Sequence, residues 1–189
     1  MWPARSPDGR WLATAHESEA SGFTIQRIPP QLWRMESSGP KRERALDVGM
    51  TDYALAFSTN SQDLLSGRIN SGEILIQRVS DGSNRRKFTK HAEQVTHLEA
   101  TNTVLLTTSK DLFGTVRGYA LDRMVVRLLK DKDAFGGKMI GSLTHDGRSA
   151  LVARVDGNVI ERWDALTGER VGARAYDGFE LTAVRGIPE

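Results

Sequence analysis

The chain has four histidines that could act as metal ligands: His16, His91, His97 and His145. His91 and His97 form the closest pair, and the chain has no cysteine that could complete a zinc site with them. On an extended strand, residues six positions apart are separated by roughly 20 Å, which is too far to share one ion. We therefore predict no metal site and no cofactor.

Hydroxyl and amine side chains give no pattern that is typical of a nucleophile. The chain contains no Gly-x-Ser-x-Gly turn. The segment "FGGKMIGS" (135–142) has glycines next to a lysine but lacks the spacing of a phosphate-binding loop, so we interpret it as a connection. Asp131 and Asp133 alternate with lysines, as in a solvated loop. No catalytic residue is predicted, and the chain is not expected to be an enzyme.

A repeated turn signal predicts the strands that position these residues. Four short polar segments recur along the chain: "SPDG" (6–9), "STNS" (58–61), "ATNT" (100–103) and "THDG" (144–147). A short apolar strand follows each of them, and a second alternating run comes after that strand: "QLWRM" (31–35), "EILIQRV" (73–79), "TVRGYAL" (115–121) and "NVIERWD" (158–164). A period in the low forties with several short strands per unit is typical of a propeller blade.

Aligning the second runs makes four positions equivalent: Trp33, Gln77, Tyr119 and Trp163. Their spacing predicts an insertion of about eight residues within 16–30 of the first unit. A second register is also open there, because "SGFTIQRI" (21–28) resembles "SGEILIQRV" (71–79). We predict an all-β chain with units at 1–48, 49–90, 91–134 and 135–176, and a surplus strand at 177–189.

Three segments resemble the WD40 repeat. They are "VDGNVIERWDALTGERV" (155–171), "SPDGRWLATA" (6–15) and "KHAEQVTHLEATN" (90–102). Only the last unit keeps the Trp-Asp pair, with Arg34, Arg78 and Ala120 at the Asp position elsewhere. The resemblance implies a β-propeller of four-stranded blades, about four of them in an incomplete or open ring. It also implies a structural role for the residues at the repeat-motif positions: Trp33, Tyr119, Trp163, Asp164 and His91.

An open ring exposes two apolar sheet faces, and such faces favour association. We therefore expect one of three explanations for the open ring. The chain is a fragment of a longer propeller, a half-ring that pairs with another chain, or the product of a truncated reading frame. Self-association through the open blade faces is the corresponding partner prediction.

In WD40-like rings, the loops between blades and the loops between second and third strands share one face. By resemblance, this face and the first-unit insertion supply the predicted partner-binding residues: His16, Phe23, Arg68, Asn70, Lys110, Lys132, Phe135 and Tyr176. Basic residues also gather on the predicted outer strands, at Lys41–Arg44, Arg85–Lys90 and Arg170–Arg174. We interpret them as protection of exposed strand edges and keep a basic contact surface as the alternative.

Our functional prediction is a non-catalytic scaffold that binds a protein or peptide. The alternatives are a regulatory or sensor segment of a larger protein, for example one with a kinase or protease, and a propeller-type hydrolase. A net charge of +2 argues against nucleic acid as a partner, and no apolar run is long enough to span a membrane. The absence of cysteine and of a signal peptide predicts a cytoplasmic location.

Overall fold

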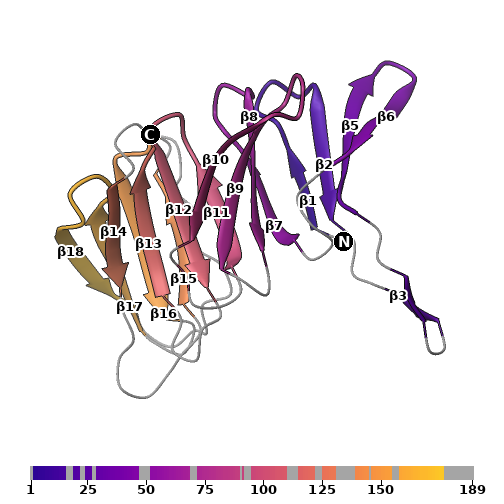
Figure 1. Cartoon of the computed structure of the whole chain (residues 1–189). Coiled ribbons are helices and arrows are strands. Elements are labelled where there is room, and N and C mark those ends of the chain that lie inside the picture. The colour runs from indigo at the N-terminus through magenta and orange to yellow at the C-terminus, as the bar shows by residue number, and fades with distance from the viewer. Residues whose placement is uncertain are drawn as a thin grey trace. The chain divides into compact units, whose positions relative to one another are not determined.

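The structure is a computed structural model of the whole chain, shown in Figure 1. It describes residues 2–15, 19–21, 24–26, 29–46, 52–68, 72–89, 91, 95–109, 115–121, 125–130, 139–144, 146–154 and 158–176. Contacts divide the chain into two compact units, residues 1–98 and 99–189, which we describe one at a time. Among the described residues, no helix is long and apolar enough to cross a bilayer.

All regular elements of the described chain are strands. In the first unit they are β1 (Trp2–Arg5), β2 (Trp11–Ala15), β3 (Glu19–Ser21), β4 (Thr24–Gln26), β5 (Gln31–Glu36), β6 (Gly39–Ala45), β7 (Asp52–Phe57), β8 (Asp63–Arg68), β9 (Glu73–Arg78) and β10 (Asn84–Thr89). The unit boundary falls within β11 (Val95–Ala100). In the second unit the strands are β12 (Val104–Ser109), β13 (Thr115–Ala120), β14 (Val125–Lys130), β15 (Met139–Leu143), β16 (Ser149–Arg154), β17 (Val159–Asp164) and β18 (Arg170–Ala175).

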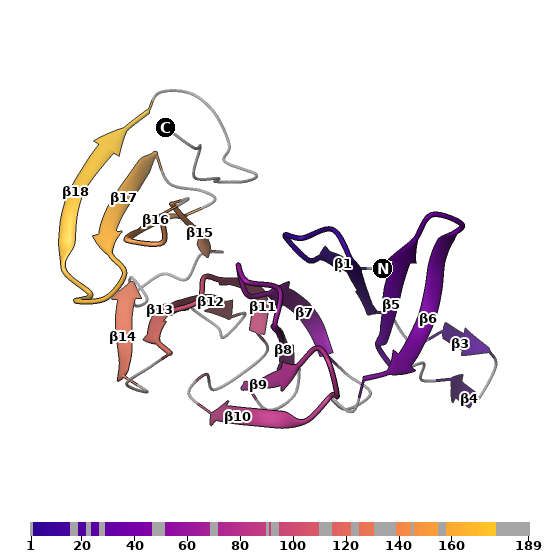
Figure 2. The same cartoon turned by 90° about the horizontal axis from the view of Figure 1, so that it is seen from above.

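Sixteen of these strands form four antiparallel sheets of four strands each. The strands follow one another across each sheet in chain order, as Figure 2 shows for β15 to β18. We call the sheets blade one (β1, β2, β5, β6), blade two (β7 to β10), blade three (β11 to β14) and blade four (β15 to β18). The prediction of an all-β chain with four four-stranded blades is confirmed.

A hydroxyl residue organises the turn between the first and second strands of blades one, two and four. In blade one, the Ser6 hydroxyl donates to Asp8 (2.6 Å) and accepts the backbone N–H of Trp11 (2.9 Å). The same two bonds recur at Ser58 in blade two and at Thr144 in blade four. The residue after the acid or amide has positive φ in all three turns, which suits Gly9 and Gly147 and is unusual at Ser61.

Blade three has a shorter version of this turn. Thr101 accepts the backbone N–H of Val104 only three residues later (3.0 Å), and Ala100 is still part of β11. The segment "ATNT" therefore predicted this turn one residue too early.

The third strands have the register that the sequence predicted. Trp33, Gln77, Tyr119 and Trp163 each pair with the second residue of the preceding strand, namely Leu12, Leu64, Leu105 and Ala150. The insertion in blade one includes β3 and β4, which pair only with each other. The structure therefore selects Gln31–Glu36 as the third strand of blade one and excludes the alternative register at 21–28.

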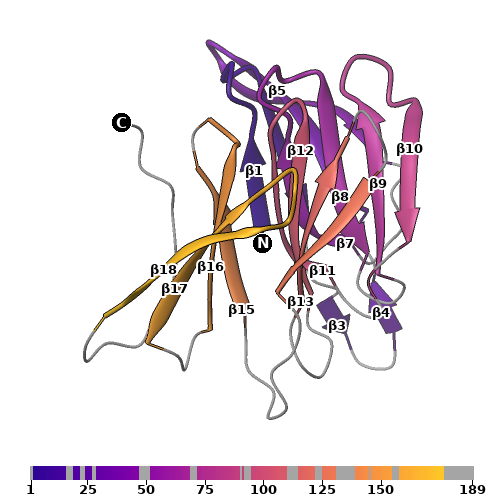
Figure 3. The same ribbon diagram turned by 90° about the vertical axis from the view of Figure 1, so that its left-hand side faces the viewer.

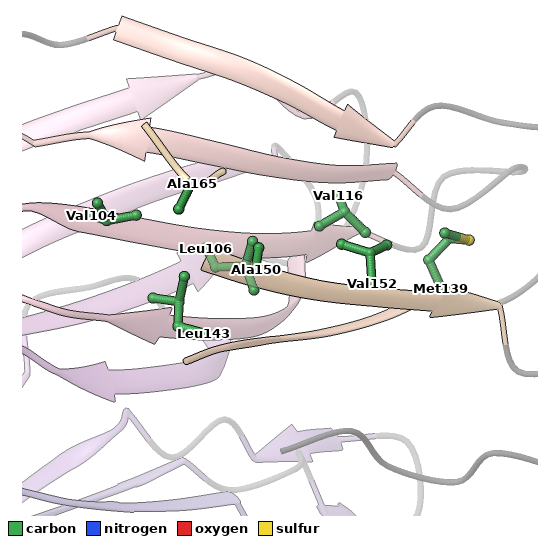
Figure 4. Close-up of a cluster of buried hydrophobic side chains, with 8 residues drawn as sticks. All are labelled: Val104, Leu106, Val116, Met139, Leu143, Ala150, Val152 and Ala165. Atoms are coloured by element: carbon green, nitrogen blue, oxygen red, sulfur yellow. The ribbon is translucent and has the colours of Figure 1, made fainter. Parts of the chain in front are cut away.

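Each unit has its own core between two blades. In the first unit, Ala13 and Leu32 of blade one pack with residues of blade two that include Phe57, Leu64 and Leu75. In the second unit, Val104, Leu106 and Val116 of blade three pack with blade four. Figure 4 shows this second cluster, with Val104 and Leu143 toward one end and Val116 and Met139 toward the other.

Candidate binding surface at the loop end of the blades

Every blade has two ends with different connections. At one end, the turn end, the first strand turns into the second and the third into the fourth. At the other, the loop end, the second strand connects to the third, and the fourth connects to the next blade. The predicted partner-binding residues belong to the loop end and to the blade-one insertion.

Arg68 is the predicted partner-binding residue for which the structure gives the most detail. It is the last residue of β8 rather than part of the following loop. Its guanidinium forms an ion pair with Glu73 of β9 (2.8 Å), and the other oxygen of Glu73 lies 2.5 Å from the amine of Lys87 on β10. We call Arg68, Glu73 and Lys87 the charged cluster. The cluster crosses three adjacent strands at the loop end of blade two.

The electrostatics of the charged cluster favour an ionised carboxylate. The hydrogen bond from Lys87, helped by Arg68, lowers the pKa of Glu73 despite some opposing desolvation. The Lys87 side chain is 54% exposed and that of Arg68 is 34% exposed, whereas Glu73 is 15% exposed. Two cations therefore surround one shielded carboxylate, and Asp52 of β7 pairs with Arg68 in the sheet.

Tyr176 follows β18 in the second unit and is half-buried. Its backbone N–H donates to the carbonyl of Asn158 (2.9 Å), so its position is fixed by the loop-end segment that precedes β17. The remaining predicted binding residues lie outside the described residues: His16, Phe23, Asn70, Lys110, Lys132 and Phe135. Arg68 belongs to the first unit and Tyr176 to the second.

The aromatic residues of the repeat motif have three different environments. The Trp33 indole donates to Thr14 (3.0 Å), and the Trp163 indole donates to Glu161 (3.2 Å) and packs against the core of the second unit. Tyr119 is completely buried, and this burial raises its pKa to about 12. His91 is also buried.

Asp164 organises the turn between β17 and β18. Its carboxylate accepts the backbone N–H groups of Thr167 (2.7 Å) and Leu166 (2.9 Å). These bonds, led by that from Thr167, lower its pKa. Gly168 closes the turn with φ of 74°, as Gly82 does with φ of 75° in blade two.

Basic residues on the fourth strands contact acidic or polar groups of their own unit. In blade one, Lys41 of β6 lies 3.9 Å from Glu36 of β5, and Arg42 donates to Gln31 (2.7 Å). In blade two, Arg85 pairs with Asp63 (3.1 Å), and in blade four, Arg170 lies 3.6 Å from Glu161. These contacts support the interpretation as strand-edge protection more than a basic contact surface.

The hydroxyl groups of the repeated turns have structural partners rather than catalytic ones. Ser6, Ser58 and Thr144 each donate to an acid or amide side chain and accept a backbone N–H. Within the described ranges, no group of three or more histidine, aspartate or glutamate side chains is arranged to hold a metal ion.

Comparisons with known proteins agree with this geometry. No protein-family model and no curated protein matches the sequence. Among solved structures, the chain is similar to the β-propeller domain of Cps50 (Swd1) from Myceliophteria thermophila, with a TM-score of 0.67 at 13% identity over 97% of this chain and 75% of that one. The WD40 repeats of RRP9 match with a TM-score of 0.65 at 15% identity, over 92% of this chain and 48% of that one.

Two further matches cover about half of the solved chain. The computationally designed protein Ika8 has a TM-score of 0.66 at 18% identity, over 92% of this chain and 49% of that one. Hydrazine synthase from Kuenenia stuttgartiensis has a TM-score of 0.66 at 12% identity, over 92% and 48%. The chain therefore has the fold of part of a WD40-type β-propeller, and the predicted resemblance is confirmed at the level of the fold.

Proposed function

We propose that this chain is a non-catalytic scaffold that binds a protein or peptide at the loop end of its blades. The observation that carries the proposal is the charged cluster at the loop end of blade two. WD40-type propellers supply a rigid strand framework, and here the repeated hydroxyl turns fix the opposite end of the same blade. A binding group on rigid strands loses little conformational freedom when a partner binds.

The composition of the charged cluster indicates the chemistry of the partner. Arg68 and Lys87 carry two positive charges against the single charge of Glu73, and both cations are partly exposed. An acidic side chain of a partner would pair with these partly exposed cations. Arginine presents a planar fork that suits such a carboxylate.

A selection of random peptides displayed on phage, with the full chain as bait, tests the proposal. We expect enrichment of peptides that contain aspartate or glutamate. A selected peptide should bind the Arg68→Glu variant at least about tenfold more weakly, because the substitution replaces attraction with repulsion. The matched control is Arg10→Glu, the same change at an exposed residue of the turn end, which should leave the affinity within about twofold. Failure to enrich any peptide, or equal loss in both variants, would contradict the proposal.

The non-catalytic part of the proposal has a separate test, since an enzyme is among the matched structures. The purified chain should show no hydrolysis of a panel of simple esters and lactones above the buffer rate. Turnover that copurifies with the chain and depends on its folded state would favour the hydrolase alternative.

A further inference from the structure

The exposed large apolar side chains of the described chain all belong to the outer hairpin of blade four. They are Val159 of β17 at 36% exposure, Leu166 in the turn at 48% and Val171 of β18 at 60%. Among the described strands, β18 is the last of its sheet and pairs only with β17, and five of its six residues are exposed. Figure 2 and Figure 3 both show it on the outside of the blade. The hairpin therefore presents apolar surface next to an open strand edge.

A bulge lies at the same position in the outer strands of blades one, two and four. The pairing passes over Glu43 in β6, Arg85 in β10 and Val171 in β18. Glu43 forms an ion pair with Arg34 (3.1 Å). Arg85 forms one with Asp63 (3.1 Å). Two of the bulge side chains are thus charged and held within their own blade, whereas the third is an apolar side chain in solvent.

The outer strands of blades one and two also carry charge on both sides of the bulge. Lys41–Arg44 is a charged run in β6, and Arg85–Lys87 is one in β10. In β18 the corresponding middle, Val171–Ala173, is uncharged. A Cβ at Gly172 would meet no atom of the described chain within 4 Å, so the middle of the strand is open. Charge on an edge strand prevents pairing with another strand, and an edge without it is a template for a further strand.

The charges around β18 indicate which kind of strand would pair with it. Arg170 and Arg174 flank the uncharged middle, and both are exposed. Arg170 lies 3.6 Å from Glu161, and the exposed Glu169 precedes the strand. No acidic side chain of the described chain pairs with Arg174. A second β18 would bring two more arginines and no acid to this edge, whereas a strand with an acidic residue would complement Arg174.

We infer that β18 binds an extended peptide by strand addition. The peptide backbone pairs with the outer edge of β18, an apolar residue in the middle of the peptide contacts Val171, and an acidic residue near one end pairs with Arg174. In this mode of binding, main-chain hydrogen bonds supply affinity and alternate side chains supply specificity. The residues involved belong to the second unit and the charged cluster belongs to the first, so the inference does not rest on the proposed function.

A selection from a random peptide library tests the inference, with the full chain as bait and counter-selection on the Val171→Glu variant. Glu43 occupies the equivalent bulge in blade one, so a blade accommodates glutamate there. We expect enriched peptides that alternate β-branched or aromatic residues with polar ones and have an acidic residue near one end. A selected peptide should bind Val171→Glu at least about tenfold more weakly and Arg174→Glu about fivefold more weakly.

Two measurements distinguish strand addition from other kinds of binding. Methylation of one of the two alternating sets of backbone nitrogens in the peptide removes the donors that face β18 and should weaken binding at least about tenfold. The amide hydrogens of 170–174 should exchange more slowly when the peptide is bound.

Two control variants separate this site from net charge and from the charged cluster. Arg148→Glu makes the same charge change as Arg174→Glu at a turn-end side chain that is 84% exposed, and it should keep the affinity within about twofold. Arg68→Glu should also leave the affinity unchanged, so the two binding sites stand or fall separately. Thermal melting shows whether each variant is folded.

Three results would overturn the inference. The first is that no peptide survives the counter-selection. The second is a selected peptide whose affinity is unchanged by methylation of either set of nitrogens or by Arg174→Glu. The third is a dimer of the chain, seen by light scattering, that Val171→Glu dissociates, because a second copy would then occupy the edge in place of a peptide.

Discussion

Blades three and four have the same strand order and register but very different burial. Five of the six residues of β13 are buried, whereas none of the six residues of the equivalent strand β17 is. The second strands differ less: β12 is buried throughout, and β16 is buried at four of six positions. Leu151 and Ile160 are as apolar as Leu106 and Val116, but β17 also carries Arg162 and Asp164 where β13 has Gly118 and Ala120. In a repeat fold, the neighbour on each side decides how much of a blade is buried.

The largest difference between the two blades should appear on truncation of the equivalent leucines. Leu106→Ala leaves a cavity in the core of the second unit and should lower the free energy of unfolding by about 3 kcal/mol. Leu151→Ala should cost only about 1 kcal/mol, because the half-exposed side chain leaves less apolar surface to lose. Both variants are measured by urea unfolding. Equal costs would contradict the different burial of Leu106 and Leu151.

Two glycines at the contacts between blades differ in the space around them. A Cβ at Gly67 of blade two would lie 2.7 Å from Cβ of Val95, whereas one at Gly141 of blade four would lie 3.3 Å from the end of Leu106. Gly67→Ala should therefore destabilise the chain by about 2 kcal/mol, since the Val95 Cβ cannot move without the backbone. Gly141→Ala should stay within about 1 kcal/mol, because the Leu106 side chain can shift. Denaturant unfolding of both variants provides the measurement, and a reversed order would contradict the packing described for β8 against β11.

The sequence predicted the strands well because their signals are local. The hydroxyl turns at Ser6, Ser58 and Thr144 depend on residues two to five positions apart, so a quoted segment contains most of each turn. Blade three deviates because its turn at Thr101 is two residues shorter, and a spacing rule derived from the other blades misplaces it. The division of the chain into blades at the predicted residue boundaries remains a prediction.

The candidate site was far less predictable. Arg68 was predicted as a loop residue, but its ion pair with Glu73 and the contact of Glu73 with Lys87 depend on the register of three strands. That register becomes visible only once Gly67 is known to pair with Ile74. A sequence signal did exist, since Arg68, Glu73 and Lys87 all lie near the loop end of their strands. The separation of fourteen residues between Glu73 and Lys87 hides it unless the strands are aligned.

Tyr119 of blade three and Trp163 of blade four occupy equivalent positions. At neutral pH, this position should show the smallest predicted change in the free energy of unfolding. Burial raises the pKa of Tyr119 from 10.0 to about 12 in the folded chain. The folded pKa lies above the unfolded value, so the contribution to stability is fully present below pH 10 and is lost as the pH rises through 12. At pH 11 the unfolded state is already mostly ionised at this group, and the stability should have fallen by about 1 kcal/mol relative to pH 9.

Tyr119→Phe removes this ionisable group from the buried side of blade three, so the alkaline loss of stability should become smaller by the same amount. Urea unfolding at pH 9 and pH 11 measures the change, and ultraviolet absorption should show one phenol fewer titrating near pH 12. Trp163→Phe in blade four is the matched control, because the indole has no proton to lose in this range and its removal should leave the pH dependence unchanged. If Tyr119→Phe retains the full alkaline loss, a group other than the phenol of Tyr119 is responsible for that loss.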